Sequence, residues 1–228
     1  RLMFSVYVSG TDTGIGKTVV STTLLHALRG HGLAAVGMKP VASGCTQTAQ
    51  GWRNEDAEAL WAASDPQPAY ADLNPYALPQ PLAPEIAARE AGVQVELDVI
   101  VSAFQRLRTI AGAVVVEGVG GWDAPLATTL FQADVVRALR LPVVMVVGLR
   151  LGCLNHARLT ARAIAADGCE LVGWIANHVD AAMDRQDENF ELLGNRIAAP
   201  CWGRLPYCVT PEPAALAHRI SIRSPAKG

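Results

Sequence analysis

The fold of the chain is decided by the stretch SGTDTGIGKTVVSTTLL at residues 9–25. A buried apolar strand is expected to end at Gly10, a loop follows, and Lys17 and Thr18 open an amphipathic helix. Amides of such a loop and helix N-terminus attract phosphate oxygens, with Lys17 neutralising the β- and γ-phosphates and the Thr18 hydroxyl binding Mg²⁺. Thr11 replaces the first glycine of the strict G-x-x-x-x-G-K-[ST] pattern, and Gly10 lies one residue early. This variant loop predicts binding of a nucleoside triphosphate.

Apolar runs rich in Val and Ile recur outside this stretch, each followed by a longer amphipathic segment. They are continuous rather than alternating, which is typical of parallel strands buried on both faces. The pattern predicts a single P-loop NTPase-like α/β domain over residues 1–228, with a doubly wound, mostly parallel sheet flanked by helices. The expected strands are 4–10, 33–41, 113–118, 142–148, 171–177 and 201–206. The expected helices are 17–29, 56–63, 84–90, 97–108, 129–139, 155–166 and 187–198, and the proline-rich segment 64–84 is expected to be a stiff, irregular loop.

The composition argues against several classes of protein. Hydrophobic residues make up 50% of the 228 positions and charged residues 18%, which is too apolar for a disordered chain. No run of about 18 apolar residues is free of charge, so a membrane span is not expected. The net charge of -2 gives no electrostatic reason to expect nucleic acid or an anionic membrane surface as a partner. The 5 cysteines form no C-x-x-C pair, so we expect reduced thiols in a cytoplasmic protein.

Two acidic residues are candidate metal ligands beside Thr18, because Mg²⁺ prefers carboxylate, phosphate and water oxygens. Glu117 follows the apolar run AVVV at the carboxyl end of an expected central strand, the edge where ligands bind in open α/β sheets. A solvated carboxylate at a strand end is the alternative for Glu117. Asp56 lies at an expected helix N-terminus, where an acidic residue also simply complements the helix dipole.

A second lysine, Lys39, ends the next expected strand in GMKPVASG. Pro40 forces the chain to leave in an extended conformation, so Lys39 can emerge at the ligand edge of the sheet. There it could stabilise the charge of a transferred phosphoryl group in the transition state. A surface lysine at a strand end is the alternative interpretation.

Two amide side chains further along the chain are candidate ligand contacts, one at an expected helix start and one at an expected strand end. Asn155 in LGCLNHA is a good N-cap residue, and free amides there could receive a substrate carboxylate, although an ordinary capped helix explains it equally well. Asn177 could pair with the edge of adenine through its donor and acceptor, with GRLP at 203–206 as the other wall of a base pocket. The 5 histidines show no ligand spacing, and we expect them to be non-catalytic.

Together these motifs resemble those of dethiobiotin synthetases. GTDTGIGKT, KPVASG, RNEDA, ALPQPLAPEIAA, VEGVGGW, LPVVMVVGLRLGCLNHARLT, GWIAN and GRLP occur in the order and spacing of that family, over about residues 6–206. Many NTPases share the phosphate loop, but the combination of KPVASG with VEGVGGW and GCLNHA is highly specific. The resemblance implies an ATP- and Mg²⁺-dependent ligase of biotin biosynthesis. It would convert 7,8-diaminononanoate and CO2 to dethiobiotin through an N-carbamate and a carbamic–phosphoric anhydride, releasing ADP and phosphate.

The resemblance also implies roles for individual residues, with ATP as co-substrate and a homodimer as the working form. Lys39, Lys17 and Ser43 would be catalytic, and Thr18, Asp56 and Glu117 would hold the metal. The nucleotide would contact Thr13, Gly14, Ile15, Gly16, Lys17, Thr18, Val19, Asp56, Glu117, Asn177, Arg204, Leu205 and Pro206. The diamine would contact Thr13, Lys39, Ser43, Pro81, Gly120, Leu151, Gly152, Leu154 and Asn155, with the segment ending at Asn155 reaching across the dimer interface. Some family members carry an acidic residue where this chain has Gly14, so that side-chain contact is missing here.

Three other kinds of protein share parts of the pattern. Switch ATPases of the partition and septum-positioning class carry a signature lysine five residues before the loop lysine, where this chain has Asp12. Amidotransferase-type corrinoid synthetases need a glutaminase domain with a nucleophilic cysteine, for which the segment after Pro206 leaves no room. A non-catalytic nucleotide-binding module would require neither Lys39 nor the acidic metal candidates.

Overall fold

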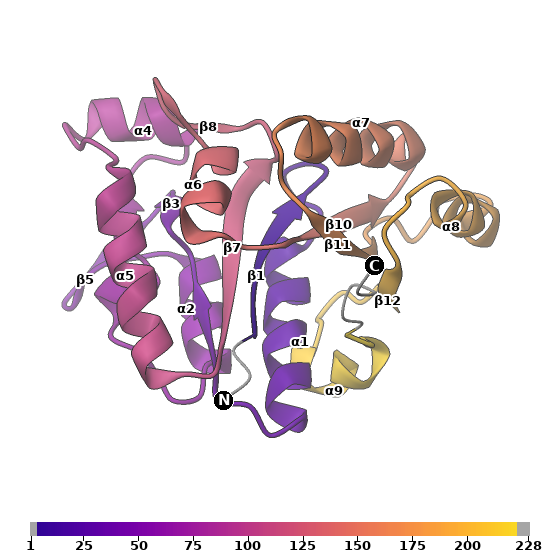
Figure 1. The fold of residues 1–228 in the computed structure, drawn as a ribbon, viewed down its shortest axis with the longest axis horizontal. Coiled ribbons are helices and arrows are strands. Elements are labelled where there is room, and N and C mark those ends of the chain that lie inside the picture. The colour runs from indigo at the N-terminus through magenta and orange to yellow at the C-terminus, as the bar shows by residue number, and fades with distance from the viewer. Residues whose placement is uncertain (1–3, 223–228) are drawn as a thin grey trace.

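The computed structural model describes residues 4–222, and six parallel strands form its main sheet. The strands are β1 (Phe4–Gly10), β2 (Ala35–Met38), β7 (Ala113–Gly121), β10 (Val143–Leu149), β11 (Leu171–His178) and β12 (Cys201–Leu205), in the spatial order β12-β11-β10-β1-β7-β2. β1 therefore lies between β7 and β10, where the chain changes its direction of progress across the sheet. Ligands of open α/β sheets bind at the carboxyl end of the strands at such a point. In Figure 1 the arrowheads of β1 and β7 point to the same edge of the molecule, where the loop that follows β1 also lies.

Helices cover both faces of the sheet, as the strand–helix alternation predicted. They are α1 (Lys17–Gly30), α2 (Glu55–Ala63), α3 (Tyr70–Leu73), α4 (Pro84–Glu90), α5 (Leu97–Ile110), α6 (Gln132–Leu139), α7 (Cys153–Ala166), α8 (Gln186–Gly194), α9 (Pro213–Leu216) and the 3-10 helix η1 (Ala217–Arg219). One apolar core contains residues of α4, α5 and α6, and a second contains residues of α1, α2 and α9. Between residues 4 and 222 no helix has the length and apolar character needed to cross a lipid bilayer.

The central strand β7 shows why the apolar runs are continuous. Val114 and Val116 lie in the first core, whereas Ala113 and Val115 lie in the second. Successive side chains of a strand point to opposite faces, so a strand covered on both sides must be apolar at every position. The predicted α/β fold with a parallel sheet is confirmed.

The prediction of one strand over 33–41 was wrong. β2 ends at Met38, and the chain starts a separate strand, β3 (Val41–Ser43), which pairs with β6 (Tyr76–Leu78) outside the main sheet. The break falls at Pro40, which has no N–H to donate to a sheet ladder. The Lys39 N–H instead donates to the Leu73 carbonyl at 2.7 Å. This break directs Lys39 and the residues after it toward the carboxyl edge.

Segment 64–84 is more regular than predicted, because it contains α3 and β6. The parallel pairing of β6 with β3 continues in backbone hydrogen bonds from Gly44 N–H to Gln80 O and from Cys45 N–H to Leu78 O, both 3.0 Å. The remaining short strands are β4 (Thr46–Thr48), β5 (Gly51–Arg53), β8 (Pro125–Ala127) and β9 (Leu130–Phe131). The end of the proline-rich segment is thus tied to the strand that follows Lys39.

Three predicted helix boundaries also need correction. The helix predicted over 129–139 begins only at Gln132, where the Asp134 carboxylate accepts the Phe131 N–H at 2.8 Å. α7 begins at Cys153 after Gly152, whose φ of 95° ends the preceding turn, so Asn155 lies in the first turn and is not the N-cap. The helix predicted over 187–198 ends at Gly194.

Candidate active site

The loop between β1 and α1 is shaped to receive an anion. Gly14 and Gly16 have φ angles of 70° and 79°, in the left-handed region that favours glycine. A Cβ at Gly16 would overlap the Asn177 amide, which donates to the Ile15 carbonyl at 2.8 Å and so ties the loop to β11. Within residues 4–222 no side chain caps the N-terminus of α1, so its first N–H groups remain available.

Asp12 anchors the start of this loop from three directions. Its carboxylate accepts the Thr13 N–H at 2.7 Å and forms an ion pair with Arg150, which follows β10. Its backbone carbonyl accepts a hydrogen bond from the Lys17 amine at 2.9 Å. The position where switch ATPases carry a lysine therefore carries a carboxylate that stabilises the loop internally.

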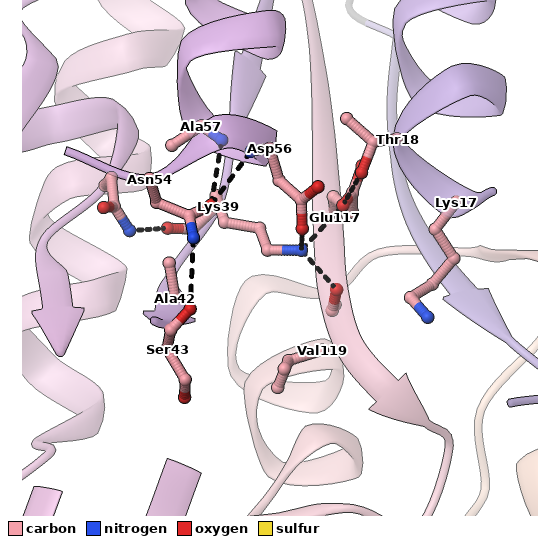
Figure 2. A network of polar contacts seen from close by, with 12 residues as sticks. Lys17, Thr18, Lys39, Ala42, Ser43, Asn54, Asp56, Ala57, Glu117 and Val119 are labelled. Carbon is pink, nitrogen blue, oxygen red and sulfur yellow. Dashed lines mark hydrogen bonds and ion pairs between the residues drawn. The ribbon is translucent and has the colours of Figure 1, made fainter. Parts of the chain in front are cut away.

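Lys39 lies between two carboxylates, as Figure 2 shows. Its Nζ is 2.6 Å from Glu117 Oε1 and 3.0 Å from Asp56 Oδ2, and it donates to the Gly118 carbonyl at 3.1 Å. Thr18 Oγ1, from the first turn of α1, donates to the same Glu117 oxygen at 2.8 Å. Lys39 is 3% exposed and Glu117 0%, so neither is the solvated strand-end residue of the alternative interpretations.

The charges of Lys39, Glu117 and Asp56, which we call the Lys39 cluster, depend on one another. Burial alone would lower the pKa of Lys39, but the carboxylates of Glu117 and Asp56 outweigh it and raise that pKa. Burial would likewise raise the pKa of Asp56, but the neighbouring Lys39 ammonium outweighs it and lowers that pKa. Lys39 is therefore an ammonium at neutral pH, and the cluster favours positive charge between its carboxylates.

A cavity of about 750 Å³ adjoins the cluster. It is lined by most of the predicted site residues: Thr13, Gly14, Gly16, Lys17, Thr18, Val19, Lys39, Ser43, Asp56, Pro81, Glu117 and Gly120. Its volume is within the range of roughly 300–1,000 Å³ that is typical of small-molecule sites. Segments that lie far apart in the sequence thus converge on one space.

Asn54 also lines this cavity, although it was not among the residues predicted for the site. Its Oδ1 accepts the N–H groups of Asp56 and Ala57 at 3.0 and 3.3 Å, and its Nδ2 donates to the Ser43 carbonyl at 3.1 Å (Figure 2). It therefore fixes the start of α2, which carries Asp56, against the strand that carries Ser43. An asparagine directly before an acidic first turn is an N-cap signal that could have identified it.

A second cavity, of about 220 Å³, lies on the other side of Gly14, Gly16 and Val19. Asn177 and Pro206 line it, as predicted for a base pocket, together with Val179, Tyr207, Cys208, Pro211, Leu216 and the histidine His178. Residues after 206 thus form a wall of this cavity that was not predicted from the sequence.

Three other predicted nucleotide contacts, Ile15, Arg204 and Leu205, are not among the residues that line either cavity. The side chains of Ile15 and Leu205 are buried in the core on the α1 side of the sheet. Arg204 donates to His178 Nε2 at 2.7 Å and pairs with Asp187 at 2.6 Å, facing a neighbouring cavity. The side chains of these three residues therefore do not face a ligand in either cavity.

The predicted diamine contacts Leu151, Gly152, Leu154 and Asn155 do not line the large cavity either. They lie around the start of α7, and the Leu151 side chain is 93% exposed. A single copy of the chain therefore does not bring this segment together with Lys39 and Ser43.

The donor set fits a magnesium ion that is completed by phosphate and water. Glu117 Oε2 is buried and, within residues 4–222, has no hydrogen-bond partner. Thr18 and Asp56 supply further oxygens on the same cavity wall. The described part of the chain has no group of three or more His, Cys, Asp and Glu residues suited to a metal. Mg²⁺ in nucleotide sites keeps several water and phosphate ligands, so one or two carboxylates are enough to hold it.

Solved structures that resemble the chain share its fold. The MinD cell division protein of Aquifex aeolicus matches 93% of this chain and 84% of its own with a TM-score of 0.55 and 14% identity. The signal recognition particle receptor FtsY of Elizabethkingia anophelis, in complex with GDP, matches 94% of this chain and 60% of its own with a TM-score of 0.51 and 15% identity. At these identities the likeness shows a shared P-loop α/β fold alone.

Sequence relatives are much more similar. A family model described as an AAA domain matches residues 5–213. The ATP-dependent dethiobiotin synthetase BioD of Xanthomonas oryzae pv. oryzae is 66% identical over 95% of this chain and 96% of its own length. The enzyme of the same name from Xylella fastidiosa is 63% identical over 94% of this chain and 95% of its own length. The chain therefore belongs to the ATP-dependent dethiobiotin synthetases.

Proposed function

We propose that this chain closes the ureido ring of dethiobiotin in biotin biosynthesis, using 7,8-diaminononanoate, CO2 and ATP. The observation that carries the proposal is the convergence of Lys17, Lys39, Thr18 and Glu117 on one cavity. Lys39 brings a second buried ammonium to this cavity, in addition to Lys17 of the phosphate loop. Ser43 Oγ supports an additional substrate, because it belongs to the same wall and has no hydrogen-bond partner among the described residues.

The nucleotide would lie along the β1–α1 loop. Its base would occupy the smaller cavity beside Asn177 and Pro206, and its phosphates would meet the free N–H groups of α1. Gly16 and Val19 line both cavities, so a triphosphate chain that runs past these two residues would extend from the base cavity into the larger one. The terminal phosphate would then lie near Lys17 and Lys39.

The chemistry needs positioning and charge neutralisation rather than a protein nucleophile. An uncharged amine of the substrate attacks CO2 and loses a proton, which gives a carbamate anion. A carbamate oxygen attacks the γ-phosphorus, the bond to the β–γ bridging oxygen breaks, and ADP leaves. The second amine attacks the carbonyl carbon of the resulting anhydride, the bond to the phosphate oxygen breaks, a proton is lost and inorganic phosphate leaves.

The residues of the cavity match the charges that develop in these steps. Lys17 would neutralise the β- and γ-phosphates, and Lys39 the phosphoryl group in transfer. Ser43 Oγ could donate to a carbamate oxygen. Thr18, Asp56 and Glu117 would hold Mg²⁺, which when bound neutralises phosphate charge. The rim of Pro81, Leu82, Ala83 and Pro84 would help to exclude water from the anhydride.

A homodimer would complete the substrate site. The exposed Leu151 side chain lies in the predicted diamine-binding segment, which is outside the cavity in a single copy. A second copy of the chain could cover this apolar side chain and bring the segment to the diamine. Residues 1–228 would form one domain in each copy.

The function is tested by measuring phosphate release from ATP with the diamine and bicarbonate, and with ATP alone. We expect turnover only when the diamine and bicarbonate are both present, with dethiobiotin formed in equal amount to ADP. ATP turnover that is indifferent to the diamine would contradict the proposal and favour a switch ATPase.

The affinity for nucleotide should depend on pH through Lys17. Burial, and next the repulsion from Lys39, lower the pKa of Lys17 to about 8. Only the ammonium form attracts phosphate, so affinity should be constant below that pKa and weaken by up to about tenfold per pH unit above it. Calorimetric titration at pH 7, 8 and 9 measures this dependence. In Lys17→Arg the guanidinium stays charged, so its affinity should not change with pH; an equal decline in both proteins would assign the effect to another group.

A further inference from the structure

Gln132 is a buried polar residue that the mechanism does not use. It is the first residue of α6, its exposure is 0%, and it does not line the large cavity. Its amide side chain nevertheless has a partner for every donor and acceptor that it carries. Such a fully satisfied buried group rigidifies the backbone that it contacts.

The partners of Gln132 belong to β1, to the glycine-rich end of β7 and to Trp122, the residue directly after β7. Its Oε1 accepts the Tyr7 hydroxyl at 2.8 Å and the Val119 N–H at 3.2 Å. Its Nε2, which carries two hydrogens, lies within hydrogen-bond distance of three carbonyl oxygens: those of Val119 at 3.0 Å, Trp122 at 3.2 Å and Gly121. One side chain thus binds backbone groups at three positions of the segment 118–122: Val119, Gly121 and Trp122.

The same segment forms part of the active site. The Gly118 carbonyl accepts the Lys39 amine at 3.1 Å, and Val119 and Gly120 line the cavity. A Cβ at Gly120 would lie 3.5 Å from Thr13 Oγ1, so this backbone runs beside the phosphate loop. Displacement of the segment would therefore move both a hydrogen-bond partner of Lys39 and the cavity wall.

Tyr7 and Gln132 also explain the glycine at position 118. A Cβ there would overlap Gln132 Oε1 and approach the Tyr7 hydroxyl to 2.8 Å. Tyr7 is itself fixed by an edge-on contact with the Trp122 ring, at 6.5 Å between centroids. The paired side chains of Tyr7 and Gln132 therefore hold this segment, and neither of them lines the cavity.

We propose that Gln132, held by Tyr7, is a positioning residue that sets the Gly118–Trp122 backbone against Lys39 and the substrate. The proposal rests on the proposed function, because it concerns the geometry of the ring-closing site. The hydrogen bonds of the Gln132 side chain go to Tyr7 and to the 119–122 segment, and Gln132 does not line the base cavity. Its loss should therefore affect use of the diamine far more than binding of the nucleotide.

Gln132→Met tests the proposal, because it keeps an unbranched side chain of similar length without hydrogen bonds. We expect kcat/KM for the diamine to fall roughly 100-fold, since displacement by about 1 Å costs that much, while the Kd for ATP changes less than about threefold. Amide exchange over residues 118–122 should become faster. Tyr7→Phe should have a smaller effect, and it should add nothing to Gln132→Met.

Ser64→Ala is the matched control for loss of buried hydrogen bonds. Ser64 Oγ is buried, accepts the Gly37 N–H at 2.9 Å, donates to the Leu60 carbonyl at 2.7 Å and lies away from the cavity. Ser64→Ala should lower the melting temperature without changing kcat/KM for the diamine. If Gln132→Met lowered only the melting temperature, the role of Gln132 would be structural and the proposal would be overturned.

Gln132→Glu provides a second readout. Its carboxylate faces the carbonyls of Val119, Gly121 and Trp122 and cannot donate to them, whereas the protonated carboxyl can donate to one of them. Activity relative to the unmodified enzyme should therefore recover as the pH falls from 8 to 6; no recovery would count against the proposal. If the unmodified chain ignored the diamine altogether, the proposed function would fail, and unchanged amide exchange in Gln132→Met would separately refute the positioning role.

Discussion

Lys39→Gln should lower kcat for diamine-dependent ATP turnover on the order of 10²–10³-fold, while the Kd for ATP changes only a few-fold. Removing one preorganised donor to transition-state charge costs about that factor. Lys39 faces the cavity from the side of Glu117, whereas the phosphate loop and Lys17 lie across β7 from it (Figure 2). Steady-state phosphate release and calorimetric binding of ATP measure the two effects separately.

The variant could lose activity simply because it fails to fold, since breaking a buried ion pair is costly. Thermal unfolding with and without Mg²⁺ and ATP shows whether the fold survives. Lys39→Arg keeps a cation between Glu117 and Asp56 and serves as the matched control for that pairing. It should retain the melting temperature of the unmodified chain but not its kcat, because the planar guanidinium places its donors differently. Full turnover in a folded Lys39→Gln variant would remove Lys39 from the mechanism.

Glu117→Gln should reduce turnover by roughly 10³-fold and raise the Mg²⁺ concentration needed for half-maximal activity. A metal ion supplies several kcal/mol of charge stabilisation in the transition state, and each 1.36 kcal/mol is worth about tenfold in rate. Glu117 is 0% exposed and its Oε2 is unpaired among the described residues, so no water-exposed group replaces it easily. Titration of activity with Mg²⁺ at saturating ATP is the measurement.

Asp56→Asn provides a graded comparison for Glu117→Gln. Asp56 shares the Lys39 ammonium with Glu117, but its side chain is 46% exposed, so water can substitute for one of its oxygens. We therefore expect a smaller increase in the Mg²⁺ requirement than for Glu117→Gln. Equal Mg²⁺ titrations for Glu117→Gln and the unmodified chain would show that Glu117 is not a metal ligand.

The parts of the fold that depend on local pattern could be predicted from the sequence. β1, the loop and α1 follow one another directly, and the continuous apolar runs identify parallel strands covered on both faces. The separation of β3 from β2 and its pairing with β6 could not be predicted, because a strand of three residues has no periodicity to detect. Its pairing depends on contacts made after the chain has turned at Pro40.

The site shows the same limit. The residues of the phosphate loop, Lys39 and Glu117 were identified because each ends a strand or opens a helix at the carboxyl edge of the sheet. The roles of Asn54 and Gln132 depend on neighbours that sequence order does not reveal; Tyr7 and Gln132 are 125 positions apart. Arg204 and Leu205 were predicted to contact the adenine base because they belong to the motif GRLP. They end β12, where successive side chains point to opposite faces, and their side chains face Asp187 and the core, respectively.

The central claim is that Lys17, Lys39 and a metal held by Thr18 and Glu117 surround the terminal phosphate beside the diamine. A crystal structure of the chain with Mg²⁺, a non-hydrolysable ATP analogue and 7,8-diaminononanoate tests it most directly. We expect the γ-phosphate to lie between the two lysine amines, with the diamine within reach of the γ-phosphate and of Ser43. A Lys39 amine that remains remote from the γ-phosphate, with the diamine bound elsewhere, would contradict it.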